Sequence, residues 1–470
     1  PEACLVIGEE PIRPYECDGL TIYRETPLAV AIPENEAQVV AVLKVCHALG
    51  VPVVPRGAGT GLSGGALPHS QGVLLSMVKM KSIVRVDPKA QLAVVQPGVR
   101  NLAISEAAQP HGLYYAPDPS SQIACTIGGN VAENSGGVHC LKYGLTVHNV
   151  VRARVILMDG DIVELGGEAP DSPGMDLLAL FVGSEGLLGV VTEVTVKLIP
   201  SPESARLIMA SFDSTTEAAD AVAAIISAGI IPAGLEMMDQ ATTAAVEPFV
   251  NAGYDLDAAA ILLAESDGSV DEVEAEIKHM EAVLRDCGAR TLSISASEQQ
   301  RLLFWAGRKA AFPAIGRISP DYYCMDGTIP RRRLGEMLGA IGDMEDKYGL
   351  RCANVFHAGD GNLHPLIMFD ANVAGEVERA EQFGAEILEL SVAFGGSITG
   401  EHGVGAEKIN QMCVQYSAEE LERFHSVKRA FDPEGLLNPG KAIPTLHRCA
   451  EYGAMIVHGG ELPFPELPRF

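Results

Sequence analysis

One glycine-rich run, Pro-Arg-Gly-Ala-Gly-Thr-Gly-Leu-Ser-Gly-Gly at positions 55–65, constrains the fold more than any other part of the chain. Five glycines in nine residues lose much conformational entropy on folding, so a functional role explains this run better than an ordinary flexible turn does. Gly59, Gly61 and Gly64 satisfy the G-x-G-x-x-G pattern, but a Rossmann site requires that pattern to open a helix. Here the next apolar run, 73–77, reads as a strand. We therefore expect an anion-binding nest of backbone N–H groups between two strands.

A second glycine-rich stretch occupies positions 117–144. Its prolines fix φ, its glycines permit close approach, and its Ser, Thr and Asn side chains can form hydrogen bonds. Such a segment could wrap the ribose, pyrophosphate and isoalloxazine of an extended dinucleotide. The segments concerned are Pro117-Asp118-Pro119-Ser120-Ser121, Thr126-Ile127-Gly128-Gly129-Asn130 and Asn134-Ser135-Gly136-Gly137.

The first half of the chain is otherwise rich in strand-like runs. A strand over 28–32, a helix over 34–49 that ends at Gly50, and a buried strand over 51–54 predict a βαβ unit. Further strands are expected over 73–77, 92–96, 150–157, 161–165 and 190–198.

The pattern changes after Pro200 and Pro202, which break any regular element. Longer units follow, and two in tandem suggest an α+β sheet covered by helices on one face. The expected strands are 205–211, 233–238, 259–265 and 289–295, with helices over 215–228 and 270–287.

Charge and cysteine usage exclude several classes of protein. The 34 Lys and Arg residues against 61 Asp and Glu give a net charge of −27, which repels nucleic acid and anionic lipid. A small anionic substrate would be repelled too, so its site needs a local cation. No apolar run approaches the length of about 18 residues that a membrane span needs, and no signal peptide is visible. The ten cysteines are scattered without a CxxC pair, which argues against a zinc ribbon or an iron–sulfur cluster and predicts reduced thiols.

A pair of histidines flanks the strongest hairpin signal in the chain. Asp360-Gly361 lies between two apolar runs, and a two-residue loop there would place His357 directly opposite His364. Two facing imidazoles are a good start for one metal ion, although an ordinary hairpin with a surface histidine pair has the same pattern. A third ligand must come from elsewhere, and the run Gly-Glu-His-Gly-Val-Gly at 400–405 offers one.

The two glycine-rich stretches, with Gly183-Ser184-Glu185-Gly186 and Gly189-Val190-Val191-Thr192 further on, resemble the vanillyl-alcohol-oxidase (PCMH) type of FAD-binding fold. Within that fold, the chain is similar over essentially its whole length to the branch of FAD-linked 2-hydroxy-acid dehydrogenases. Some proteins of this fold attach FAD covalently through a histidine in the first loop. Residues 55–65 contain no histidine, so we expect FAD to be bound noncovalently.

The resemblance implies an α+β architecture with a PCMH-type FAD-binding domain and a substrate-binding cap domain. We expect an N-terminal segment at 1–20, the FAD-binding domain at 21–200, the FAD-linked oxidase C-terminal domain at 201–441, and a tail at 442–470 that is a candidate subunit contact. The residues expected to bind FAD are Pro55, Arg56, Gly57, Ala58, Gly59, Thr60, Gly61, Leu62, Ser63, Gly64, Pro117, Asp118, Pro119, Ser120, Thr126, Gly128, Gly129, Asn130, Asn134, Gly136, Gly137, Glu185, Gly189, Val190 and Asn438.

The resemblance also implies the catalytic residues. Carried over residue by residue, His357, His364 and Glu401 bind a divalent metal (Zn, Mn or Fe), and the adjacent His402 acts as the base. The arginine that holds the substrate carboxylate maps onto Arg308, whose planar guanidinium can grip a carboxylate bidentately. Relatives that use 2-hydroxyglutarate carry a lysine where an ungapped match places Cys324, which favours a monocarboxylic acid.

The expected activity is FAD-dependent oxidation of a small 2-hydroxy acid, glycolate to glyoxylate, with D-lactate dehydrogenase as the nearest alternative. A metal-dependent hydrolase would leave the two glycine-rich stretches unexplained, and a silent scaffold would have no use for the site residues. The resemblance implies companion flavin and iron–sulfur subunits that pass electrons to the quinone pool. It places the enzyme in the cytoplasm, peripheral to the inner membrane through those partners. The apolar tail from Thr445 to Phe470 either packs on its own domain or docks such a partner.

Overall fold

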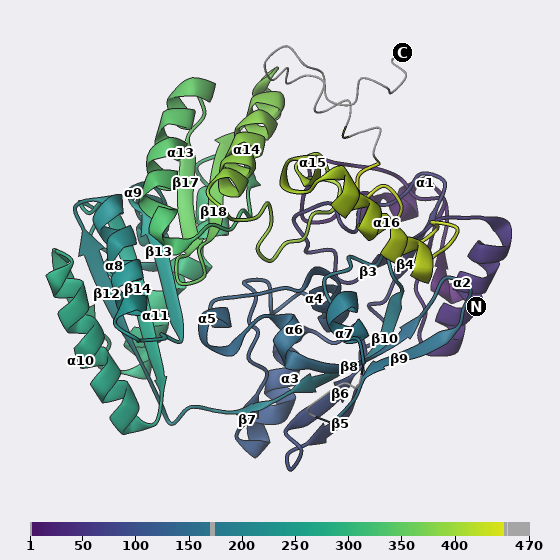
Figure 1. Ribbon diagram of the computed structural model, residues 1–470, viewed down its shortest axis with the longest axis horizontal. Helices are drawn as coiled ribbons and strands as arrows, with labels where there is room; N and C mark the ends of the chain where they lie inside the picture. The colour runs from purple at the N-terminus through teal and green to yellow at the C-terminus, as the bar shows by residue number, and fades with distance from the viewer. Residues whose placement is uncertain (1, 170–173, 446–448, 450–470) are drawn as a thin grey trace.

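The computed structural model describes residues 2–169, 174–445 and 449. The first half of the chain folds around two main sheets and a short two-stranded one, and the second half builds a larger sheet beside them (Figure 1). The yellow C-terminal segment, with α15 (Met412–Gln415) and α16 (Ala418–Phe431), returns to the first half. None of the described helices combines the length and apolarity that crossing a lipid bilayer requires. Apart from Thr445 and Cys449, the prediction about the tail concerns residues outside the described part of the chain.

The first sheet contains the predicted βαβ unit. Strands β2 (Ala29–Ala31) and β3 (Val53–Arg56) both pair in parallel with β4 (Val73–Ser76), which lies between them in the order β1-β2-β4-β3. Helix α2 (Glu36–Leu49) begins where the Asn35 side chain accepts a hydrogen bond from Gln38 N, and ends at Gly50 with φ +63°. The glycine run 55–65 follows β3 and leads to β4 without an intervening helix, as the sequence predicts.

The second sheet carries the other wall of the first half. It is antiparallel, with the order β5-β6-β10-β8-β9. The second glycine-rich stretch contains a short helix that the sequence did not reveal, α4 (Ile127–Glu133), and its Ile127 and Val131 are buried in the core. Bounds in this half are β1 Leu5–Val6, α1 Glu9–Ile12, β5 Ile83–Asp87, β6 Leu92–Val95, α3 Asn101–Ala108, β7 Leu113–Tyr114, α5 Cys140–Tyr143, α6 Thr146–Asn149, β8 Val150–Ile156, β9 Ile162–Gly166, α7 Leu177–Phe181, β10 Val190–Lys197 and β11 Ile199–Pro200.

The third sheet has seven antiparallel strands in the order β15-β12-β14-β13-β17-β18-β16. Its two faces bury different clusters: Leu262 belongs to a cluster that includes residues of α8, α10, α13 and α14, whereas Leu263 belongs to one that includes residues of α9, α11 and α12. The expectation of helices on one face only was therefore wrong. Bounds are β12 Ser204–Phe212, α8 Thr215–Ser227, β13 Gly234–Asp239, α9 Gln240–Val250, β14 Ala260–Gly268, α10 Val270–Asp286, β15 Thr291–Ile294, α11 Glu298–Lys309, α12 Ala311–Ile315, β16 Asp321–Cys324, α13 Leu334–Tyr348, β17 Cys352–His357, β18 Asn362–Phe369 and α14 Glu376–Ala393.

The C-terminal segment closes the first sheet. Val53 N donates to Leu436 O and Asn438 N donates to Val53 O, so residues 436–438 run along β3. The buried Lys428 ammonium donates to the carbonyl oxygens of Leu187 and Leu437, each at 2.7 Å. Residues from the far end of the chain therefore pack directly behind the first glycine run.

The histidine hairpin differs from its prediction in register. The loop is four residues long (358–361), and both Asp360 N and Gly361 N donate to His357 O. Consequently His357 pairs with Asn362, and His364 stands opposite Val355. The two histidines are diagonal neighbours rather than directly opposed. Because the shift is two residues, both side chains still lie on the same face.

The prediction that all thiols are reduced was also wrong. Cys413, next to the start of α15, forms a disulfide with Cys449. The other eight cysteines are free. The two partners are 36 residues apart and belong to no spacing motif, so the sequence carries no signal for their pairing.

Candidate functional site

A cavity of about 380 Å³ lies between the two glycine-rich stretches and extends to the second half of the chain. Of the residues expected to bind FAD, those that line it are Pro55, Arg56, Gly57, Ala58, Gly59, Thr60, Gly61, Leu62, Pro119, Ser120, Thr126, Gly128, Gly129, Asn130, Glu185, Gly189 and Val190. From the second half, His364, Glu401 and His402 reach the same cavity. The structure thus joins the two parts that the sequence presented separately.

Eight of the expected FAD-binding residues do not line the cavity, and three of them form polar contacts that support its walls. Asn438 Nδ2 donates to Gly65 O at 3.0 Å and to Glu185 O at 2.6 Å, which ties the first glycine run to the segment around Glu185. Asn134 Oδ1 accepts from Val147 N, and Asp118 pairs with His139. The full set is Ser63, Gly64, Pro117, Asp118, Asn134, Gly136, Gly137 and Asn438.

Sequence reasoning missed several cavity residues. Ser184 and Gly186 flank Glu185, so their position was a usable signal. Lys309 is the last residue of α11, Phe312 and Pro313 belong to α12, and nothing local marks them. The residues not predicted are Gly65, Ala66, Met77, Pro97, Ser121, Cys125, Val131, Ala132, Glu133, Ser135, Phe181, Ser184, Gly186, Val191, Lys309, Phe312 and Pro313.

The cavity suits a flat, extended cofactor because glycines in its wall leave space where side chains would otherwise project. A Cβ at Gly61 would meet only Asp18 Oδ2, at 3.8 Å, and a Cβ at Gly129 would meet only Thr126 Oγ1, at 3.7 Å. These glycines leave room for a ligand rather than for the protein's own packing. The residues present therefore fit a dinucleotide flavin.

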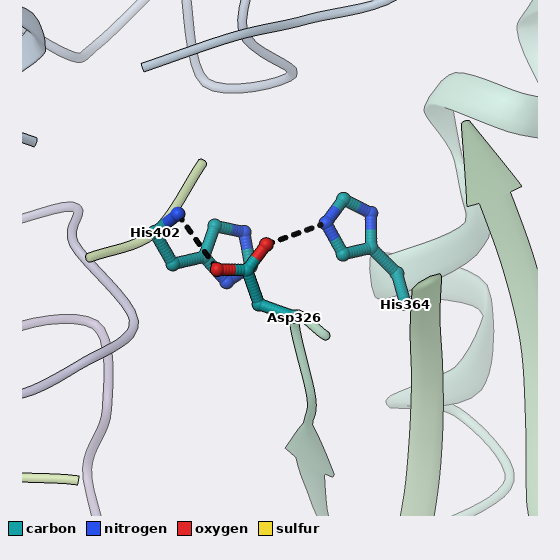
Figure 2. Close-up of side chains that lie close together, drawn as sticks. All are labelled: Asp326, His364 and His402. Atoms are coloured by element: carbon teal, nitrogen blue, oxygen red, sulfur yellow. Dashed lines mark hydrogen bonds and ion pairs between the residues drawn. The ribbon is translucent and has the colours of Figure 1, made fainter. Parts of the chain in front are cut away.

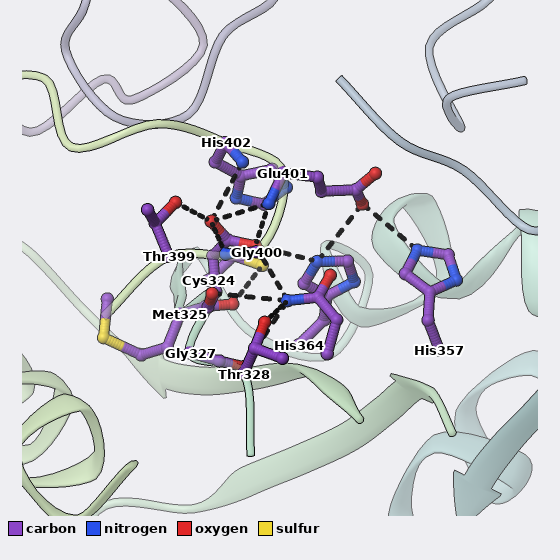
Figure 3. Close-up of polar contacts among 12 residues, drawn as sticks. Cys324, Met325, Gly327, Thr328, His357, His364, Thr399, Gly400, Glu401 and His402 are labelled. Carbon is purple, nitrogen blue, oxygen red and sulfur yellow. Dashed lines mark hydrogen bonds and ion pairs between the residues drawn. The ribbon is translucent and has the colours of Figure 1, made fainter. Parts of the chain in front are cut away.

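The metal-ligand candidates gather around one carboxylate oxygen (Figure 3). Glu401 Oε1 lies 3.1 Å from His357 Nε2 and 3.4 Å from His364 Nε2. The two imidazole centroids are 4.9 Å apart, and both side chains are buried. Among the described residues, neither ring nitrogen of His364 has a hydrogen-bond partner, which is unusual for a buried imidazole. Two nitrogen donors and a carboxylate match the preference of Zn, Mn or Fe.

The charges of this group are strongly coupled. Against the effect of burial, the carboxylates of Glu236 and Glu401 raise the pKa of His357 to about 10. Burial and the neighbouring His402 and His357 lower the pKa of His364 to about 4, although Asp326 opposes this. Although burial opposes it, the imidazoles, His357 foremost, lower the pKa of Glu401 to about 2. The group therefore holds an ionised carboxylate between two imidazoles, as a cation site requires.

Asp326, which sequence reasoning missed, organises the segment that carries Glu401 and His402. Its carboxylate accepts hydrogen bonds from Gly400 N and Glu401 N, both at 3.1 Å, and from His402 N at 2.9 Å. Thr399 Oγ1 and Asn362 Nδ2 donate to it as well, at 2.5 and 3.0 Å. Despite complete burial, His402 and Lys408 hold the pKa of Asp326 well below its usual range. The segment's shape therefore depends on this anion.

Asp326, His364 and His402 form a second group with ligand-like spacing (Figure 2). Asp326 Oδ1 lies 3.6 Å from His364 Nε2, and the His364 and His402 rings stack with centroids 4.9 Å apart. However, five donors already occupy the Asp326 oxygens, so it has little capacity left for a metal ion. The group around Glu401 is the better metal site. His402 Nδ1 is buried without a hydrogen-bond partner, which leaves the imidazole available as a base.

Arg308 lies behind the cavity rather than in its wall. Its Nε donates to Glu236 Oε2 at 2.6 Å, and both side chains are almost completely buried. Its Nη2 is buried and has no hydrogen-bond partner in the described part of the chain, which is costly for a guanidinium unless a ligand accepts from it. The neighbouring Lys309 lines the cavity in its place.

Glu185 ties the flavin cavity to the catalytic segment. It is one of few non-glycine residues with a left-handed backbone, at φ +51°. Its two carboxylate oxygens accept hydrogen bonds from Val404 N at 2.7 Å and Gly405 N at 2.6 Å. Asp326 and Glu185 therefore hold the segment that follows Thr399 from two sides.

Comparison with known proteins places the chain among the FAD-linked oxidases. The family model described as "FAD linked oxidases, C-terminal domain" matches residues 201–442, and that described as "FAD binding domain" matches residues 27–166. The chain belongs to this family. It is a FAD-dependent enzyme that oxidises 2-hydroxy acids, with a PCMH-type FAD-binding domain.

Individual relatives sharpen the comparison. The chain is 63% identical to "Glycolate oxidase subunit GlcD" of Escherichia coli (strain K12), over 98% of this chain and 93% of that protein. It is 32% identical to "D-lactate dehydrogenase" of Anaerostipes hadrus, over 93% and 94% of the two chains. The solved structure of 4-ethylphenol oxidase from Gulosibacter chungangensis superimposes with a TM-score of 0.78 at 18% identity, covering 95% of each chain, and supports the fold alone.

Gly129→Leu tests the flavin cavity. Leucine suits helix α4, and its side chain would project into the cavity rather than into the protein. We expect a folded protein whose FAD affinity is lower by about tenfold or more, because overpacking costs on the order of 1–3 kcal/mol. The measurement is flavin absorbance per chain after gel filtration. Gly342→Leu, an exposed glycine in α13 with open space at its Cβ, is the matched control. Full flavin content in Gly129→Leu would contradict this use of the cavity.

Asp326→Asn tests the anion that organises the catalytic segment. The amide directs two N–H donors at backbone N–H groups, so we expect the unfolding free energy to fall by about 2–4 kcal/mol. Turnover and metal retention should fall with it, because Glu401 and His402 lose their anchor. Asp239→Asn is the control, since Asp239 also accepts from two backbone N–H groups, of Thr242 and Asn354, away from the cavity. Equal effects of both variants on turnover would show a general stability loss instead.

Proposed function

We propose that this chain oxidises glycolate to glyoxylate, with noncovalently bound FAD as the oxidant. One observation carries the proposal: His364, Glu401 and His402 line the same cavity as both glycine-rich stretches. A base and a cation site thus adjoin the cofactor cavity, which a 2-hydroxy-acid oxidation needs. The 63% identity to a glycolate oxidase subunit supports glycolate as the substrate.

We assign His357, His364 and Glu401 as ligands of a divalent ion. When bound, such an ion would lower the pKa of a coordinated substrate hydroxyl. The partnerless ring nitrogens of His364 and the anionic carboxylate of Glu401 supply a fitting donor set. The two carboxylates that face His357 favour positive charge at this point, from a proton or from a metal ion.

His402 is the proposed base and Arg308 the proposed clamp. His402 takes the hydroxyl proton of the substrate, and FAD, when bound, would supply an acceptor for the C2 hydrogen and its electron pair. The acid thus loses two electrons and two hydrogens in all, and its C–O single bond becomes a carbonyl. Arg308 binds the substrate carboxylate through the guanidinium edge that Glu236 leaves free. This charge offsets the repulsion that an acidic chain exerts on an anionic substrate.

D-lactate is the second candidate substrate, favoured by the 32% identity to a D-lactate dehydrogenase. Both acids present a hydroxyl next to a carboxylate and differ by one methyl group. Anaerobic bleaching of the flavin by glycolate, D-lactate, L-lactate and D-2-hydroxyglutarate separates the possibilities. Fastest bleaching by glycolate supports the proposal, and bleaching by D-2-hydroxyglutarate alone would refute it.

Electron exit completes the proposal. The relative from Escherichia coli is named as a subunit, and we propose that this chain likewise works with companion flavin and iron–sulfur subunits. These would accept electrons from the reduced flavin and lead them to the quinone pool. The chain would then work on the cytoplasmic side, peripheral to the inner membrane.

The metal assignment predicts about one divalent ion per chain. His357→Ala and His364→Ala should each lose it, because each removes one of three ligands. Elemental analysis of protein purified without chelator measures the content. His139→Ala is the control, since His139 also lies between two carboxylates, Asp118 and Glu265, but has no second imidazole beside it. Unchanged metal content in the double variant of His357 and His364 would rule out this site.

The base and the clamp should separate kinetically. His402→Ala should lower kcat and kcat/KM together, by about 10²–10⁴-fold, because it removes a proton acceptor used in the transition state. Arg308→Lys should mainly raise KM, since one ammonium cannot reproduce a bidentate grip. Arg301→Lys, on the same helix, and His425→Ala, far from the cavity, are the controls. Steady-state kinetics with glycolate decide, and wild-type parameters in His402→Ala would exclude it as the base.

A further inference from the structure

Glu236 is a fully buried carboxylate to which the scheme above assigns neither a catalytic nor a metal-binding role. It lies in the middle of β13, a central strand of the seven-stranded sheet, and is 1% exposed. Met237 on the same strand pairs with Phe356 of β17, the strand that ends at His357. An isolated carboxylate so far from water is costly unless it is paired with positive charge or hydrogen-bond donors.

Both oxygens of Glu236 are used, each by a different functional residue. Oε1 lies 2.8 Å from His357 Nδ1, and Oε2 accepts from Arg308 Nε at 2.6 Å. All three side chains are at most 3% exposed. One rigid carboxylate therefore connects the candidate metal ligand with the candidate substrate clamp.

Each contact with Glu236 also determines which nitrogen of His357 or Arg308 remains for other interactions. With Nδ1 held by Glu236, His357 directs Nε2 toward Glu401 Oε1, at 3.1 Å. A carboxylate behind a ligating histidine commonly fixes the tautomer and the ring orientation in this way. With Nε held by Glu236, Arg308 keeps Nη2 as a buried nitrogen without a partner. His357 Nε2 and Arg308 Nη2 are thus both oriented through contacts with the same carboxylate.

We propose that Glu236 is the positioning residue that fixes the distance between the metal ligand His357 and the guanidinium of Arg308. The inference rests on the proposed function. A 2-hydroxy acid carries its hydroxyl and its carboxylate on adjacent carbons, so its two anchoring points must have one short, constant separation. Tying both anchors to one buried carboxylate enforces that separation and selects acids whose hydroxyl is next to the carboxylate.

The test measures metal binding and carboxylate binding separately, both without turnover. Metal affinity is measured on FAD-loaded protein by competition with a chromogenic chelator. Carboxylate affinity is measured with oxalate, from the perturbation of the flavin absorbance. Glu236→Gln should weaken metal binding by about 10–100-fold. It should also weaken oxalate binding by about tenfold or more, because the amide directs an N–H group at Arg308 Nε.

Two further variants show whether the effects come from positioning. Arg308→Lys should weaken oxalate binding but leave metal affinity unchanged. In the double variant, Glu236→Gln should weaken oxalate binding little beyond the effect of Arg308→Lys alone. Glu265→Gln is the matched control. Glu265 is equally buried on the neighbouring strand, and it binds Arg301 and His139 instead. We expect Glu265→Gln to lower stability while both affinities stay at the wild-type value.

Two outcomes overturn the proposal: wild-type metal affinity or wild-type oxalate affinity in folded Glu236→Gln. If that variant does not fold, the double variant Glu236→Gln/Arg308→Met removes both buried charges, a change that is often tolerated. Metal affinity should still fall there, and an unchanged value refutes the role of Glu236. If the wild-type chain oxidises none of the acids, the proposed function fails, but both binding measurements still report on Glu236.

Discussion

Two buried carboxylates hold the segment on which the candidate chemistry depends. Asp326, just after β16 in the second half, accepts hydrogen bonds from the backbone N–H groups of Gly400, Glu401 and His402. Glu185, from the first half, accepts from those of Val404 and Gly405. Buried backbone donors without partners cost about 1–3 kcal/mol each, so these two anions decide the path of the segment. The position of His402 is consequently set by both halves of the chain at once.

The flavin cavity depends on the same connections. Glu185 lines the cavity, and its carbonyl oxygen accepts from Asn438 Nδ2, as does that of Gly65. Asn438 itself lies in the C-terminal segment that runs along β3. Three segments far apart in sequence therefore meet where the cofactor cavity adjoins the base. This arrangement explains why so many residues expected to bind FAD support its walls instead of lining them.

Local sequence patterns predicted most of the fold, but they could not predict contacts between residues far apart in the sequence. The βαβ unit, the glycine run without a following helix and the histidine pair are read from adjacent residues. Asp326 and Glu236 are single acidic residues whose importance comes only from partners dozens of residues away, so no spacing reveals them. The error about the third sheet was avoidable: Ala260–Ala264 is apolar without alternation, which indicates a strand covered on both faces. The hairpin register failed because Asp-Gly signals a tight turn, while the real loop is two residues longer.

The charge balance around the site supports the proposed ion. In a chain with a net charge of −27, a substrate carboxylate would approach a group that already contains Glu236, Glu401 and Asp326. The Arg308 guanidinium is partly committed to Glu236, and the buried Lys408 ammonium lies near Asp326 and Glu407. A further positive charge is needed to offset these carboxylates before an anionic substrate can bind beside Glu401. A divalent cation between His357, His364 and Glu401 would provide it, because it would replace the single proton that the carboxylates around His357 favour with two positive charges. The ion that would activate the substrate hydroxyl would thus also favour binding of the substrate carboxylate in the cavity.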